Sequence, residues 1–287
     1  MDQLPTSVPP RKPAATKWIA RIGAAVLLLL FVWIYHFAPI ADEFWNGQVI
    51  YYIIIVASLA AAISGTLLTR QFEKGEPPRR VWLTFTLGWW AWALGELTDL
   101  VYSFVYADYP EFTLIDACWV LGYLFFGLSL YHQFRLIYDR KKKMGTAYYL
   151  PVAALILLIT AGFTQLAIQR GLGEEWSWAG VYLAVFYPVC DLVQGAAALW
   201  LSLLFGRGRW GRPWWALICF AIADAISTWF WIGGGADLSQ ETRNLIWLFS
   251  DTVYLGGYLL AALAFLSAYR LQKSNTTPLE TLLKRHV

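Results

Sequence analysis

The chain has 287 residues, of which 59% are hydrophobic, 17% are aromatic and only 14% are charged. Ordinary soluble domains carry roughly 25% charged residues, so this composition excludes a typical water-soluble globular protein. The apolar residues fall into blocks of about 20, the length that a helix needs to cross a hydrocarbon layer roughly 30 Å thick. The sequence therefore predicts an all-α integral membrane protein with several transmembrane helices.

Eight such blocks follow one another, separated by short segments rich in charged and turn residues. Outside them we expect only short loops, a disordered tail at residues 1–17 and a polar tail at residues 272–287. Any function must therefore lie within the helices or at their ends. We expect eight transmembrane helices, at residues 18–38, 48–68, 81–105, 112–137, 147–168, 179–205, 212–233 and 244–270.

The basic residues predict the orientation of these helices. If the eight helices cross in alternating directions, 20 of the 22 Lys and Arg residues lie on the side that holds both termini, and only Arg170 and Arg243 lie on the other side. Basic residues are enriched in short cytoplasmic loops, so we expect cytoplasmic N- and C-termini. The basic run at residues 140–143 fits such a loop, and we expect no nucleic-acid partner.

The two halves of the chain share a pattern of polar residues, which predicts an internal repeat. Four helices per unit make both copies start on the same side, so the repeats would be parallel, at residues 18–143 and 144–271. Chance similarity between apolar segments is the alternative. The matched pairs are Asp116 with Asp251, Gly122 with Gly257, Tyr123 with Tyr258 and Arg135 with Arg270, at an offset of 135 residues, and Glu96 with Asp224, at an offset of 128.

Six acidic residues fall within the predicted helices, and no Lys or Arg lies at comparable depth. Ionisable side chains cost several kcal/mol in a bilayer and usually face the bundle interior or a water-filled cavity. From the helix directions and a rise of 1.5 Å per residue, all six should lie between the middle and the outer end of their helices. They are Glu96, Asp99, Asp116, Asp191, Asp224 and Asp251.

This distribution predicts an acidic cavity that opens outward, or two such cavities related by the repeat. Because no cation lies nearby, we expect several of the acids to be protonated and to donate hydrogen bonds. They could bind a cation or a proton, or hold a polar or cationic ligand together with aromatic rings, for which Trp229 and Tyr254 are candidates. Alternatively, each acid bonds a Trp, a Tyr or the backbone and fixes helix packing.

Several kinds of chemistry lack the residues that they need. A retinal protein needs a lysine deep within a helix, and no block contains one. His36, His132 and His286 lie near helix ends or in a tail, which does not suit haem ligation. The metalloprotease motif H-E-x-x-H is absent, and the three cysteines have no metal-ligand spacing. We predict no enzymatic activity and no metal site, and the sequence identifies no cofactor.

Two short motifs resemble a known family. The segment 110–123 contains Asp116 followed by a Gly-Tyr pair, and the segment 187–192 reads Tyr-Pro-Val-Cys-Asp-Leu. Both are similar to the multi-helix membrane sensor regions that precede bacterial diguanylate cyclase, phosphodiesterase and histidine kinase domains. The resemblance covers the third to eighth blocks. It implies a ligand-sensing module in a bacterial inner membrane, with Asp116, Asp191 and, through the repeat, Asp251 in the matching positions.

The chain departs from that family because only 16 residues follow Leu271, too few for an output domain. We therefore expect a non-enzymatic sensor or ligand-binding module, with an outward-facing acidic and aromatic pocket, that signals through a membrane or cytoplasmic partner. A cation- or proton-coupled secondary transporter is one alternative, since parallel repeats and buried carboxyl groups also suit alternating access. An accessory subunit of a larger membrane complex is the other.

Overall fold

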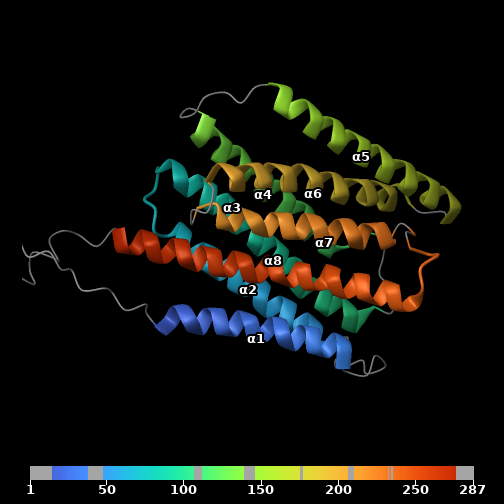
Figure 1. The fold of residues 1–287 in the computed structure, drawn as a ribbon, viewed down its shortest axis with the longest axis horizontal. Coiled ribbons are helices and arrows are strands. Elements are labelled where there is room, and N and C mark those ends of the chain that lie inside the picture. The colour runs from blue at the N-terminus through green and yellow to red at the C-terminus, as the bar shows by residue number, and fades with distance from the viewer. Residues whose placement is uncertain are drawn as a thin grey trace, which may run out of the picture.

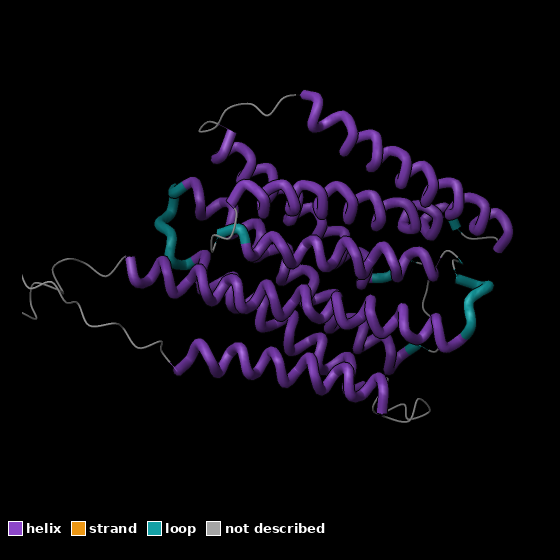
Figure 2. The backbone as a smooth tube through the Cα atoms, in the orientation of Figure 1, coloured by secondary structure: helices purple, strands orange, loops and turns teal. Residues whose placement is uncertain are grey.

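A computed structural model describes residues 15–37, 48–106, 112–138, 146–174, 177–205, 210–231, 233 and 235–275. The regular structure in these ranges is entirely helical (Figures 1 and 2), which confirms the all-α prediction. The helices are α1 (Ala15–Phe37), α2 (Ile50–Thr69), α3 (Pro77–Val105), α4 (Leu114–Tyr138), α5 (Thr146–Glu174), α6 (Trp178–Phe205), the short 3-10 helix η2 (Arg212–Trp214), α7 (Trp215–Trp231) and α8 (Gln240–Asn275).

Each predicted block coincides with one α-helix. Six of these helices, α1, α2, α4, α6, α7 and α8, are long and apolar enough to cross a membrane. Helix α3 has 29 residues, but its four tryptophans and two acids lower its mean hydropathy. Helices α1 and α8 extend a few residues into the predicted tails, whereas the rest of those tails and the basic run at 140–143 lie outside the described residues.

The helices lie side by side in one bundle, with α1 and α5 on opposite edges (Figure 1). Helix α5 packs mainly on α6, and α1 packs mainly on α8 and α2. Both edge helices expose large apolar side chains, among them Trp18, Leu29 and Leu158, as expected of surfaces in contact with lipid. The start of α1 and the end of α8 lie at the same end of the bundle, which we call the terminal end; the opposite end is the distal end.

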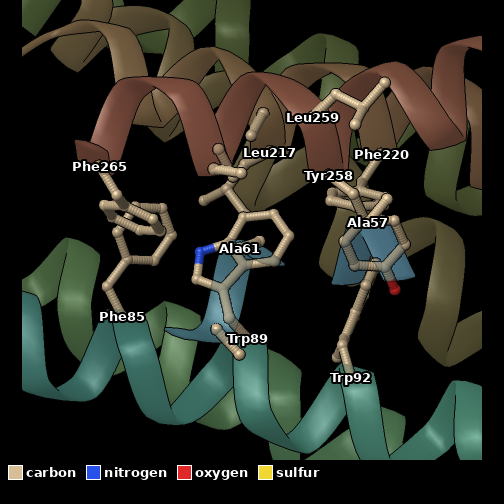
Figure 3. Close-up of a cluster of buried hydrophobic side chains, with 14 of the residues drawn as sticks. Ala57, Ala61, Phe85, Trp89, Trp92, Leu217, Phe220, Tyr258, Leu259 and Phe265 are labelled. Carbon is tan, nitrogen blue, oxygen red and sulfur yellow. The ribbon is translucent and has the colours of Figure 1, made fainter. Parts of the chain in front are cut away.

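Buried aromatic side chains fill the half of the bundle nearer the terminal end. Phe85, Trp89 and Trp92 have the spacing of one helix face and project from α3 towards side chains of α7 and α8 (Figure 3). Phe85 stacks on Trp214 with ring centroids 4.7 Å apart. Such pairs contribute about 0.5–1.5 kcal/mol beyond the burial of their area. We call the set of Phe85, Trp89, Phe126, Trp214, Phe220 and Phe265 the aromatic core.

Helices α3 and α4 approach each other through two reciprocal contacts between tryptophan and glycine. The indole of Trp92 in α3 lies over Gly122 in α4, and the indole of Trp119 in α4 lies over Gly95 in α3. At either glycine, an added Cβ atom would overlap the facing ring. Only glycine permits so close an approach, so these positions set the distance between the two helices.

We expect Gly122→Ala to destabilise the protein by about 1–3 kcal/mol, the usual cost of overpacking a core, because Trp92 is buried and cannot move into free space. Gly256→Ala in α8 is the matched control, since no atom lies within 4 Å of its added Cβ and alanine favours the helix. Thermal unfolding in detergent, followed by circular dichroism, measures both. Equal melting temperatures for Gly122→Ala and the wild type would contradict this packing.

Candidate functional site

A cavity of about 800 Å³ lies in the distal half of the bundle, within the size range of small-molecule sites. Residues from α1, α2, α3, α4, α6, α7 and α8 line it, so it occupies the space between most of the helices. No Lys, Arg or His is among the described residues of its wall. We call it the carboxyl cavity because five carboxyl side chains line it: Glu96, Asp99, Asp116, Asp224 and Asp251.

The structure thus brings five of the six acids named from the sequence to one cavity. The sixth, Asp191, is not part of the wall. Its Oδ1 accepts a hydrogen bond of 2.6 Å from the hydroxyl of Tyr123, and Tyr123 does line the cavity. Tyr254 also lines the wall. Trp229 does not; its ring packs beside Phe230. Trp229 directly follows the wall residue Thr228. Consecutive residues of a helix point about 100° apart, so Trp229 points away from the cavity.

Tyrosine hydroxyls are the main partners of the acids. Near the distal end, Asp116 accepts a hydrogen bond of 2.8 Å from Tyr187 of α6, together with bonds of 2.8 Å from the backbone N–H and from the hydroxyl of Thr113. Asp251 of α8 accepts one from Tyr35 of α1. Each tyrosine therefore links two helices through a carboxyl group.

The deeper acids have the same kind of partner. Glu96 is 4% exposed and accepts hydrogen bonds from Tyr254 and from Tyr258 of α8, the latter of 2.7 Å. The Tyr123 hydroxyl, besides bonding Asp191, lies 3.4 Å from Oδ2 of Asp224. Sequence reasoning named these acids without identifying their donors. The signal was present, because Tyr123 and Tyr258 each follow an aspartate by seven residues, two helical turns on one face.

The aromatic part of the wall consists of ring surfaces. Trp92, Trp119 and Tyr254 line the cavity, but the Nε1 atoms of both tryptophans are buried, without a hydrogen-bond partner among the described residues. Both nitrogens lie close to the facing glycines of the α3–α4 contact, so they are enclosed by backbone. The rings therefore offer mainly their carbon surfaces to the cavity, and such surfaces attract cations.

The carboxyl groups are spread around the cavity. Among the residues that the structure describes, no three His, Cys, Asp or Glu side chains come close enough together to hold a metal ion. A cavity of this volume, with acids from several helices and aromatic rings on its wall, has room for a molecule larger than a bare metal ion.

No protein-family model matches the chain, and comparisons with curated proteins and with solved structures give no match either. The chemistry of the site therefore has to be inferred from its own geometry.

Removing one hydroxyl should show how much the tyrosines stabilise the acids. Asp191 is 3% exposed, and its Oδ2 has no partner among the residues that the structure describes. Tyr123→Phe removes the hydroxyl that donates to its Oδ1. We expect a loss of about 1–3 kcal/mol in the free energy of unfolding, the cost of an unsatisfied buried polar group. The combination Tyr123→Phe with Asp191→Leu should recover part of that loss, because neither partner then remains.

Denaturant unfolding in detergent measures these variants, and Tyr131→Phe is the control, since that tyrosine is exposed and its hydroxyl accepts a hydrogen bond from the exposed Arg135 of its own helix. If the losses from Tyr123→Phe and Asp191→Leu simply add, the two groups are not coupled and the assigned bond does not stabilise the fold.

Proposed function

We propose that this chain is a multi-pass membrane protein that binds a small organic cation in the carboxyl cavity and senses it on behalf of a partner protein. The observation that carries the proposal is a cavity lined by five carboxyl groups and by aromatic rings, with no basic group among its described residues. Where two or more of these acids are ionised they repel each other, and a bound cation offsets that repulsion. Rings between the acids add cation–π attraction.

The positions of the basic residues support an outward-facing cavity. In the described chain, Arg70, Lys74, Arg212 and Lys273 lie at the terminal end, as do the other Lys and Arg residues apart from Arg170 and Arg243. Basic residues favour the cytoplasmic side. The terminal end is then cytoplasmic, and the carboxyl cavity faces the outside of what the family resemblance implies is a bacterial inner membrane.

The packing also supports eight crossings. Helix α3 lies between α2 and α4 and packs on both, and α5 lies along α6. Each of α3 and α5 has 29 residues, which span about 43 Å at 1.5 Å per residue, more than a hydrocarbon layer of roughly 30 Å. Helices of this length beside six membrane-spanning neighbours would cross with them.

Corresponding contacts in the two halves support the internal repeat. Trp92 packs on Gly122 in the first half, and Phe220 packs by Gly257 in the second; these residues correspond at the offsets of 128 and 135. The hydrogen bonds of Glu96 and Asp224 also correspond, and each of them joins one half of the chain to the other. Tyr258 of the second half bonds Glu96 of the first, whereas Tyr123 of the first half lies beside Asp224 of the second.

A sensor agrees better with this geometry than a transporter does. The aromatic core is fully buried and lies on the terminal side of the wall residues Trp92 and Glu96, so a transported ion would have to displace many packed rings. By contrast, a ligand that changes the bonds of Asp251 or Tyr254 acts directly on α8. That helix has 36 residues and continues to the terminal end, where a cytoplasmic or membrane partner could contact it.

Thermal stabilisation of the purified protein by amines tests the proposed binding. The probes are tetramethylammonium, ethanolammonium and 1,4-diaminobutane chlorides, compared with sodium chloride at equal ionic strength. We expect at least one of these organic cations to raise the melting temperature. A ligand at 100 times its Kd adds about 2.7 kcal/mol to the free energy of unfolding. Asp116→Asn and Asp251→Asn should abolish most of this effect, because they remove negative charge from the wall.

Asp237→Asn is the matched control, since Asp237 is exposed and outside the cavity wall. The proposal is overturned if no amine stabilises the wild type more than sodium chloride does, or if the cavity variants respond as strongly as Asp237→Asn.

Cysteine labelling tests the orientation. In a variant whose native cysteines are replaced by alanine, Glu73→Cys lies in the exposed loop between α2 and α3 at the terminal end, and Ser177→Cys lies before α6 at the distal end. A membrane-impermeant maleimide added to intact cells should label Ser177→Cys only, and should label both in inverted vesicles plus detergent. Labelling of Glu73→Cys in intact cells would reverse the proposed orientation.

A further inference from the structure

A second cavity, of about 510 Å³, lies beside the carboxyl cavity at the distal end. Arg170 of α5 and Arg243 of α8 line it, and Ser227 of α7 lines both cavities. These two arginines are the exceptions to the one-sided distribution of basic residues in the sequence, and they meet at one site although 73 residues separate them. We call this site the arginine cavity.

The loop between α7 and α8 positions both guanidinium groups. Arg243 is half-buried, and its Nε donates a hydrogen bond of 3.3 Å to the carbonyl oxygen of Leu238, which holds the guanidinium at the cavity that it lines. The guanidinium of Arg170 lies against Gly233, where an added Cβ would be 3.3 Å from Cζ. Gly233 has a φ of 87°, a conformation that other residues rarely adopt.

The remainder of the wall is apolar or neutral. Phe230 stacks on Trp247 with ring centroids 4.9 Å apart and an interplanar angle of 18°, and Gln240 adds an amide. No carboxyl group is among the described residues that line the cavity. Two positively charged side chains and an apolar surface therefore line the same cavity. Its charged groups have the opposite sign to those of the neighbouring carboxyl cavity.

We propose that the arginine cavity binds a phosphate ester, and that the group comes from the headgroup of an anionic phospholipid in the outer leaflet. The planar guanidinium donates two parallel hydrogen bonds to phosphate oxygens, and two such groups match one phosphodiester. The stacked Phe230 and Trp247 provide a surface for the glycerol and upper acyl carbons of a lipid. Arg170 comes from α5 and the rest of the wall from α7, α8 and the loop that joins them, so the site lies between α5 and the α7–α8 pair.

This site is independent of the cation proposed for the carboxyl cavity, and its test uses different probes. Binding of dioctanoyl phosphatidylglycerol, dioctanoylglycerol and inorganic phosphate to the detergent-purified protein can be measured by thermophoresis. We expect phosphatidylglycerol to bind more tightly than dioctanoylglycerol, which has no phosphate. Arg170→Gln and Arg243→Gln should each raise the Kd for phosphatidylglycerol about tenfold, as expected for loss of a charged hydrogen bond.

Arg212→Gln is the matched control, since it removes an exposed guanidinium at the terminal end. Arg170 is exposed, so its variant should fold, and an unchanged melting temperature verifies this. Binding of phosphatidylglycerol without binding of inorganic phosphate supports a lipid site, whereas binding of both supports the phosphate chemistry with a soluble ester as its source. The proposal is overturned if dioctanoylglycerol binds equally well, or if the two arginine variants bind phosphatidylglycerol as the Arg212→Gln control does.

Discussion

A buried carboxyl group needs a hydrogen-bond donor, and in this bundle tyrosine provides it. Glu96, Asp116, Asp191 and Asp251 each accept a bond from a tyrosine on another helix. Pairing with lysine or arginine would have neutralised the acids and filled the space between them. A tyrosine hydroxyl satisfies the oxygen without adding a positive charge, so the helices are joined and the cavity keeps its acidic character.

The bundle is divided along its length into a dense half and an open half. Towards the terminal end, stacked rings such as Phe85 on Trp214 leave little free volume. Towards the distal end, the helices surround the carboxyl cavity. Trp92 and Trp119 belong to the boundary: they fix the spacing of α3 and α4 over the facing glycines and also form part of the cavity wall. Rigid packing thus supports the polar site.

Much of this arrangement could be predicted from the sequence. The eight apolar blocks locate the helices because crossing a membrane requires long apolar runs, and helix direction with rise per residue places the six acids between the middle and one end of their helices. The rotation of each helix could not be obtained in this way. The sequence therefore offers Trp229 as a pocket residue, although its neighbour Thr228 lines the wall instead. The role of Tyr35 was also missed, since nothing local in α1 indicates that α8 lies beside it.

The crosswise bonds have a consequence for how such a protein could arise. Tyr258 supplies the donor for Glu96, and Tyr123 lies beside Asp224, so on the proposed repeat each four-helix half completes the buried acid of the other. One half alone would leave a carboxyl group in an apolar interior without its donor, at a cost of about 1–3 kcal/mol. On the proposed repeat, a single four-helix unit would meet this need by pairing in parallel with a second copy, and gene fusion would turn such intersubunit bonds into internal ones.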